Sequence, residues 1–150
     1  MALFIGCLLA HLVLVGVVSS PWWVPDLTLV GLMLATVKTP HRWLVYSGMA
    51  GLVTLSWVVR DRWPLLLSYL ALGGFLRVVR RHWDVTDVRV QCVVSGLAAS
   101  VLTGEAMWLE DLWSIPLLGL ATVHVVMTVL AVLPARFLFG RLMPREAEPM

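Results

Sequence analysis

The chain has 150 residues, of which 60% are hydrophobic and 13% charged, with a mean hydropathy of +0.90 and a net charge of +2. A soluble domain averages about 25% charged residues, so this composition argues against a soluble fold and predicts an all-α, polytopic protein whose solvent is membrane lipid. The small net charge, with its basic residues beside apolar stretches, gives no sign of nucleic-acid binding.

Six apolar stretches separated by short polar connections predict the transmembrane helices. They cover approximately residues 2–20, 27–37, 43–59, 64–79, 88–109 and 113–139. The first stretch has no Lys or Arg before it and is long, so we expect an uncleaved span and not a signal peptide. Residues 1–143 then form one six-span transmembrane domain, and residues 144–150 form a polar cytoplasmic tail.

Several residues are typical of helix ends. Pro25 and Asp26 suit the start of the second span, because proline presets φ and a carboxylate there faces the positive end of the helix dipole. This span is short, so a broken or re-entrant start is a further interpretation. Thr86 and Asp87 are the candidate caps of the fifth span, and Glu110 with Asp111 is expected to turn the chain into the sixth. All eight Trp lie near the proposed span ends, as at membrane interfaces.

The positions of the basic residues predict the orientation. Nine of the eleven Lys and Arg fall in three clusters: Lys38 and Arg42; Arg77, Arg80, Arg81 and Arg89; Arg136, Arg141 and Arg145. The other two, Arg60 and Arg62, flank Asp61, and the remaining connection carries only acidic residues. Because basic clusters stay on the cytoplasmic side, we expect both termini in the cytoplasm.

Ionisable side chains within apolar stretches are candidates for function. His11 and His124 would suit a proton relay or a metal pair, or each would be a neutral imidazole bonded to a neighbouring helix. Two His without a third ligand make a poor metal site, so we expect no metal and no cofactor. Asp26 either faces a partner or caps its helix. Cys7 and Cys92 have no metal-binding spacing and are expected to be buried thiols.

Four glycines lie within the third and fourth spans: Gly48, Gly51, Gly73 and Gly74. Small residues let helices approach closely in lipid, so these positions predict either packing between the two spans or a groove for a partner helix. No nucleophile lies beside a base, and no glycine-rich phosphate loop occurs. We therefore expect no enzymatic activity.

These features together resemble the rod-shape-determining protein MreD family. Pro25-Asp26-Leu27 opens the second span as the family's Pro-(Asp)-Leu segment does, and a basic connection follows at residues 38–43. Residues 67–77, Leu-Ser-Tyr-Leu-Ala-Leu-Gly-Gly-Phe-Leu-Arg, are similar to the family's Leu-x-Tyr-Leu-x-x-Gly pattern, and the last span carries Pro134 before a basic end.

The resemblance implies a non-catalytic scaffold of the cell-elongation machinery, which makes peptidoglycan, in the bacterial inner (cytoplasmic) membrane. Its partner would be a single-span MreC-like protein, and through it a RodA-like transglycosylase, a transpeptidase and the MreB filament. The fold would be similar to the substrate-binding subunits of energy-coupling-factor vitamin transporters. The expected partner-binding residues are Pro25, Asp26, Gly48, Gly51, Gly73 and Gly74.

Other functions remain open. A small-molecule-binding subunit of a vitamin transporter would need polar or aromatic residues that converge on an outer pocket. The sequence offers only Trp22, Trp23, Trp108 and Glu105 for this, and interface anchoring explains them equally well. A lipid-modifying enzyme would need clustered ionisable residues, and an accessory subunit of a respiratory or photosynthetic complex is a further alternative.

Overall fold

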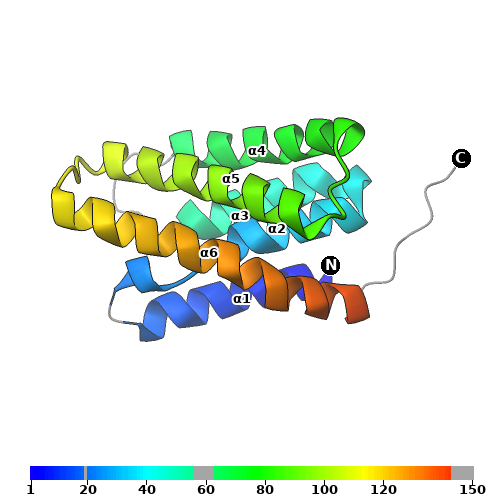
Figure 1. Ribbon diagram of the computed structural model, residues 1–150, viewed down its shortest axis with the longest axis horizontal. Helices are drawn as coiled ribbons and strands as arrows, with labels where there is room; N and C mark the ends of the chain where they lie inside the picture. Colours follow the sequence, from blue (N-terminus) through cyan, green and yellow to red (C-terminus); the bar gives the residue numbers. More distant parts are fainter. Residues whose placement is uncertain (19, 56–62, 143–150) are drawn as a thin grey trace, which may run out of the picture.

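The computed structural model describes residues 1–18, 20–55 and 63–142. Every regular element in these residues is helical, and the α-helices lie side by side along the long axis of the molecule (Figure 1). The all-α fold expected from the composition is therefore confirmed. The elements are α1 (Ala2–Val17), the 3₁₀-helix η1 (Pro21–Trp23), α2 (Leu27–Lys38), the 3₁₀-helix η2 (Pro40–Arg42), α3 (Trp43–Leu55), α4 (Trp63–His82), α5 (Val88–Leu109) and α6 (Ile115–Leu142).

The helix bounds follow the predicted stretches, with differences that have local causes. Helix α1 ends at Val17 and not at residue 20, since Val18 already has extended backbone angles before Pro21. Helix α6 begins at Ile115 and not at residue 113, because Ser114 occupies the position before the helix. Its hydroxyl accepts a hydrogen bond of 3.4 Å from the Leu117 amide. The predicted end of the third span, residues 56–59, and the predicted tail lie outside the described residues.

Two predicted helix ends are confirmed. The carboxylate of Asp87 caps α5 by accepting a hydrogen bond from the Arg89 amide. The chain then turns at Glu110 and Asp111, as expected. Asp111 has a φ of 53° there, a left-handed conformation that aspartate tolerates better than most residues.

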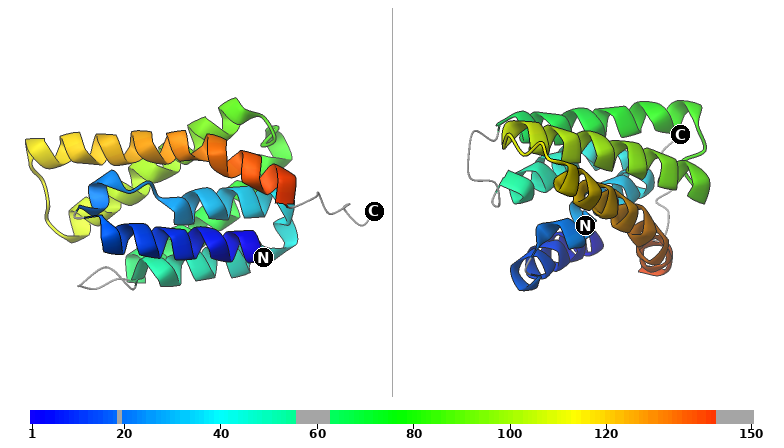
Figure 2. Two further views of the ribbon diagram at one scale, coloured as in Figure 1. Left: turned by 90° about the horizontal axis from the view of Figure 1, so that it is seen from below. Right: turned by 60° about the vertical axis from the view of Figure 1, so that its left-hand side comes forward.

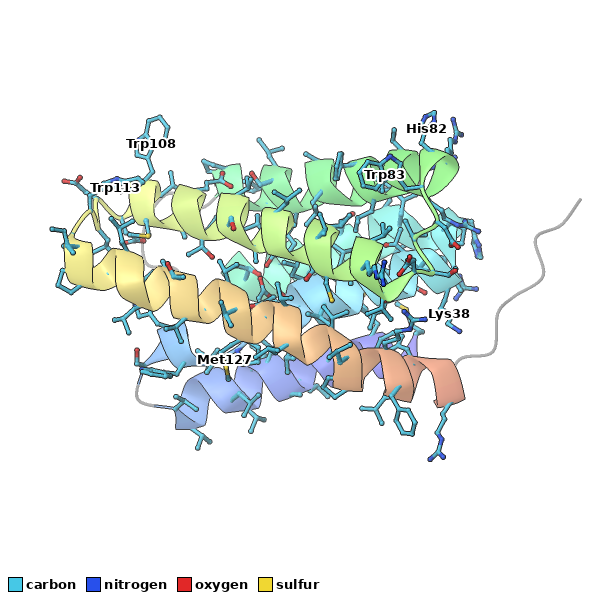
Figure 3. All side chains as sticks on the ribbon, in the orientation of Figure 1. Lys38, His82, Trp83, Trp108, Trp113 and Met127 are labelled. Atoms are coloured by element: carbon cyan, nitrogen blue, oxygen red, sulfur yellow. The ribbon has the colours of Figure 1, made fainter. Side chains whose placement is uncertain are left out.

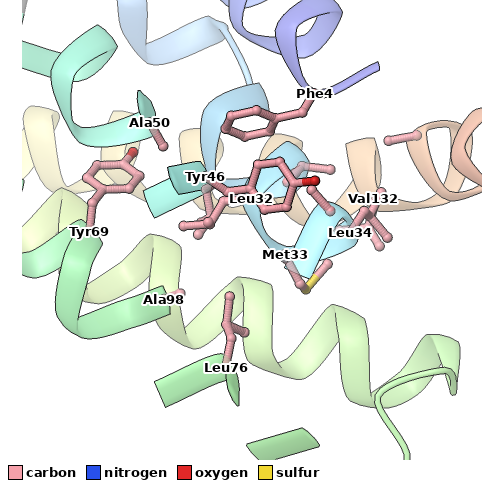
Figure 4. Close-up of a cluster of buried hydrophobic side chains, with 14 of the residues drawn as sticks. Phe4, Leu32, Met33, Leu34, Tyr46, Ala50, Tyr69, Leu76, Ala98 and Val132 are labelled. Atoms are coloured by element: carbon pink, nitrogen blue, oxygen red, sulfur yellow. The ribbon is translucent and has the colours of Figure 1, made fainter. Parts of the chain in front are cut away.

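Helix α2 is the centre of the bundle. It contacts each of the other five α-helices, and every residue from Thr28 to Thr36 is buried. The core around it draws on all of these helices, with labelled side chains such as Phe4, Leu32 and Val132 packed together (Figure 4). A short helix in this position is shielded from its surroundings by its neighbours.

The two ends of the bundle differ in character. The N-terminus and the end of α6 lie at the same end (Figures 1 and 2). Lys38 and His82 also lie there, whereas Trp108 and Trp113 lie at the opposite end (Figure 3). Because successive helices run in alternating directions, every described Lys and Arg lies on the half of the bundle with the N-terminus and the end of α6. We call these the basic end and the tryptophan end.

The outer surface of the bundle is largely apolar. Helices α5 and α6 are long and apolar enough to cross a membrane, and only 39% and 17% of their most apolar stretches are buried. Large apolar side chains that point outward include Leu9, Val13, Leu97, Val101 and Leu130. Helices α1 and α2 are also apolar but shorter. The fold is therefore compatible with a helical membrane protein.

Candidate functional site

The candidate site begins at the break in the helix between η1 and α2, inside the bundle. The amide of Asp26 donates a hydrogen bond of 2.9 Å to the Thr128 hydroxyl on α6. The carbonyl of Pro25 accepts one of 3.3 Å from Nδ1 of His11 on α1. Buried backbone groups that lie outside a helix must find such partners. Side chains from α1 and α6 thus satisfy the backbone at the point where the chain enters α2.

The carboxylate of Asp26 is buried, with 8% of the residue exposed, and three donors hold it. Its Oδ1 accepts hydrogen bonds from the Thr28 hydroxyl and, at 2.9 Å, from the Leu29 amide. Its Oδ2 accepts one of 2.8 Å from the Tyr69 hydroxyl on α4. The N-cap predicted for Asp26 is therefore confirmed. Its carboxylate is directed into the chain's own bundle.

A cavity of about 420 Å³ opens beside this carboxylate, on the half of the bundle nearer the tryptophan end. Residues from η1, from α1, α3, α4, α5 and α6, and from the connections before α2 and after α5 line it. The polar and aromatic members are His11, Trp22, Asp26, Thr54, Tyr69, Thr103, Glu110 and His124, and the apolar members are Val15, Leu65, Leu102, Ala106, Leu109 and Leu112. Sites for small molecules commonly measure about 300–1,000 Å³ and combine an apolar wall with a few polar groups.

The two candidate histidines line this same cavity. His11 is occupied by its bond to Pro25, in agreement with the interpretation of an imidazole bonded to a neighbouring segment. The Nδ1 atom of His124 is buried and has no hydrogen-bond partner in the described part of the chain. The His124 ring meets Trp22 edge-to-face, with 6.4 Å between ring centroids. No group of three or more metal-binding side chains occurs within the described ranges.

The charges around the cavity are unbalanced. Among the described residues, Asp26 and Glu110 are its acidic members, and no described Lys or Arg lines it. Glu110 is exposed, so it lies at the mouth of the cavity, whereas Asp26 lies at its buried side. The described basic residues are on the other half of the bundle. The cavity is therefore an acidic and aromatic chamber in an otherwise apolar protein.

The four predicted docking glycines fall in different environments. A Cβ on Gly73 would lie 2.8 Å from Ser47 Cβ, and one on Gly51 would lie 2.6 Å from Leu66 Cδ1. These two glycines let α3 and α4 approach each other, as the packing interpretation expects. Gly74 has ordinary contact with Trp43, and a Cβ on Gly48 would meet nothing within 4 Å. Among the four, Gly48 alone presents an open surface.

A second, smaller void lies near the basic end, between α2, α4 and α5. Its volume of about 10 Å³ is room for one water molecule at most. Thr36 Oγ1 and Gln91 Oε1 beside it are buried without a hydrogen-bond partner within the described residues. The side-chain amide nitrogen of Gln91 donates a hydrogen bond of 2.7 Å to the Val85 carbonyl. This void is too small for a ligand.

Tyr69 is the functional candidate that the sequence interpretation missed. The sequence indicates it only as part of the Leu-x-Tyr-Leu pattern of residues 67–77, yet its hydroxyl holds Asp26 and its ring lines the cavity. The available signal was a tyrosine in mid-span, because a buried hydroxyl normally has a hydrogen-bond partner.

The chain matches no protein-family model, no curated protein and no solved structure.

Proposed function

We propose that this chain is a six-span protein of the bacterial inner membrane, with both termini in the cytoplasm, and that it is a non-catalytic scaffold of the cell-elongation machinery. Its partner is a single-span, MreC-like protein. The resemblance of Pro25-Asp26-Leu27, the basic connection at residues 38–43 and residues 67–77 to the MreD family supports this role. The basic end, where the N-terminus and the end of α6 lie, supports the orientation.

The main support for a membrane location is the exposed apolar surface of the outer helices. Helix α6 has 28 residues, and 17% of its most apolar stretch is buried within the chain. At about 1.5 Å per residue it is long enough for the hydrocarbon core of about 30 Å. Lipid tails or partner helices are the surroundings that such a surface suits.

The short central helix is also suited to this environment. Helix α2 has 12 residues and is about 18 Å long, less than the bilayer core. Irregular backbone is tolerated at membrane depth only where protein surrounds and satisfies it. The bonds that Thr128 and His11 make to Asp26 and Pro25 meet this condition.

The outer face of α3 is the proposed docking surface for the partner helix. Leu44, Gly48 and Leu52 are four residues apart and so lie along one face, with Val45 beside them. Leu44 is 57% exposed, Val45 is 49% exposed and Leu52 is 60% exposed. Gly48 leaves an open space between these side chains. A small residue flanked by larger ones allows close approach of a second helix in lipid.

Co-purification from native membranes tests this function. The expected result is that the wild type retains a single-span chain with an extracytoplasmic coiled coil, and that Gly48→Leu weakens its retention. Gly119→Leu is the matched control, since a Cβ on Gly119 of α6 also meets nothing within 4 Å. If the wild type is purified in mild detergent and no such partner accompanies it, the scaffold role is wrong.

One observation favours a second candidate function, a small-molecule-binding membrane subunit. The cavity beside Asp26 collects the polar and aromatic residues that such a subunit requires, including Trp22. A bound small molecule in protein purified without any partner would favour this function. Identification by mass spectrometry of what the purified protein carries separates the two.

A further inference from the structure

We infer that the cavity beside Asp26 binds an organic ammonium compound: a protonated amine on an apolar body. This inference rests on the second candidate function, that the cavity takes a small molecule. It does not depend on the scaffold role, because the cavity and the outer face of α3 are separate surfaces. The inference adds the charge of the ligand and the orientation in which it lies.

Charge is the first argument. The buried carboxylate of Asp26 has no Lys or Arg partner among the described residues, and none of these basic side chains lines the cavity. The positive end of the α2 dipole offsets roughly half a charge. Three neutral donors also hold the carboxylate, but no described Lys or Arg supplies a full positive charge, and Glu110 at the mouth adds a second acidic group. A cation is therefore the complementary ligand, and an anion is disfavoured.

Unused hydrogen-bonding positions are the second argument. A carboxylate has about four acceptor positions. Oδ1 of Asp26 accepts two hydrogen bonds and Oδ2 accepts one, so one position on Oδ2 remains. The buried Nδ1 of His124, which lines the same cavity, also lacks a partner within the described segments. An ammonium group has N–H donors that suit both atoms, which a quaternary ammonium or a neutral hydrocarbon lacks.

The size and walls of the cavity are the third argument. A volume of about 420 Å³ is far larger than a bare metal ion needs, so the ligand has an organic body. Leu102, Ala106 and Leu109 supply an apolar wall for that body. Trp22 and Tyr69 supply aromatic rings, which attract cations. The ammonium group would lie toward Asp26 and His124, with the apolar body toward α5.

Three probes with one ring system and different head groups test the inference: tryptamine, tryptophol and indole-3-acetate. Their heads are cationic, neutral and anionic at pH 7. We expect isothermal titration calorimetry, with the protein in phosphatidylcholine nanodiscs, to show tryptamine binding at least tenfold more tightly than the other two. Equal binding of all three would show an apolar small-molecule site and overturn the ammonium inference alone. No binding of any probe would overturn both this inference and the second candidate function.

Two variants assign the effect to the cavity. Asp26→Asn is expected to abolish the preference for tryptamine over tryptophol. Because this change also alters a helix cap, Glu110→Gln at an exposed position is a second variant. It is expected to weaken the binding of tryptamine several-fold and to leave the binding of tryptophol unchanged. Ala106→Phe fills the apolar wall and is expected to abolish binding of both. A tryptamine preference that survives in Asp26→Asn and Glu110→Gln would contradict the inference.

The ammonium group has two natural sources, a soluble amine and an aminated lipid head group. Repeating the titration in phosphatidylethanolamine nanodiscs separates them. A lipid source predicts that tryptamine affinity falls at least tenfold there, through competition. A soluble source predicts the same affinity in both lipids. Either result is compatible with the inference and names the source.

Discussion

The hydroxyl of Tyr69 on α4 donates a hydrogen bond of 2.8 Å to Oδ2 of Asp26, at the start of α2. A second tyrosine acts at the other end of the same helix, where the Tyr46 hydroxyl lies 2.6 Å from Thr39 Oγ1, just after Lys38. Both ends of the central helix are thus held by buried tyrosine hydroxyls. They differ in their partners: the Tyr69 hydroxyl donates to a carboxylate and also lies 3.0 Å from the Thr28 hydroxyl, whereas the Tyr46 hydroxyl contacts the neutral Thr39 hydroxyl.

That difference predicts unequal effects of two matched variants. Tyr69→Phe leaves a buried carboxylate short of one donor, and hydrogen bonds to charged groups contribute about 1.5–3 kcal/mol. Tyr46→Phe removes a neutral hydrogen bond, which contributes about 0.5–1.5 kcal/mol. We therefore expect Tyr69→Phe to lower the free energy of unfolding by the larger amount. Reversible unfolding in mixed detergent micelles measures both.

The Tyr46 variant is the control for loss of a buried tyrosine hydroxyl as such. Both rings are buried in the same core (Figure 4) and remain in place in these variants. Equal losses of stability in the two variants would mean that Asp26 is not a charged acceptor in the folded protein.

The glycines of α3 and α4 predict opposite effects of alanine. Gly73→Ala places a Cβ 2.8 Å from Ser47 Cβ and 2.9 Å from Ser47 Oγ, so α3 and α4 must move apart. This strain should exceed the roughly 1 kcal/mol that alanine gains over glycine in helix propensity. Gly48→Ala meets no atom and keeps that gain. We expect a lower melting temperature for Gly73→Ala and an equal or higher one for Gly48→Ala, and the reverse order would contradict the α3–α4 packing.

The presence of each helix can be predicted from the sequence, because a helix depends on the local pattern of apolar residues and on the residues at its ends. The stretch predicted at about residues 88–109 coincides with α5, and residue type and position alone indicate Asp26 as one cap and the pair Thr86 and Asp87 as candidates for another. The candidate site is harder to predict, since its cavity is lined by residues from six helical elements and two connections that only the fold brings together. His11 and His124 were each recognised as unusual, but nothing in their spacing indicates a shared wall with Tyr69.

The glycines show the same limit. A small residue in an apolar helix indicates close approach but not the identity of the neighbour. Gly51 and Gly73 face another helix of the same chain, and Gly48 faces outward. Which is which depends on the rotation of α3 about its axis, and that rotation is set by packing against α2 and α4.

Two threonines of α6 provide a third prediction. Thr122 and Thr128 each donate a hydrogen bond of 2.9 Å to the carbonyl four residues earlier. Only Thr128 also accepts a bond, from the buried Asp26 amide. Thr128→Val keeps the shape and leaves that amide unpaired, which costs about 1–3 kcal/mol. Thr122→Val, at an exposed position, should change stability by less than about 0.5 kcal/mol. Chemical unfolding of the two variants checks this, and an unaffected Thr128→Val would show that the start of α2 does not need this bond.

The orientation in the membrane gives the last prediction. His82 lies at the basic end, whereas Glu110 lies in the turn between α5 and α6 near Trp108 and Trp113 at the tryptophan end (Figure 3), and both side chains are exposed. If the basic end is cytoplasmic, a membrane-impermeant maleimide added to intact bacterial spheroplasts should label Glu110→Cys and not His82→Cys. Both variants are made in a Cys7→Ala, Cys92→Ala background, since these two cysteines are free and half-buried. Permeabilised membranes provide the control, in which both variants should be labelled. Labelling of His82→Cys in intact spheroplasts would place the basic end outside. Because the cavity opens toward the tryptophan end, that result would also reverse the side from which a ligand enters.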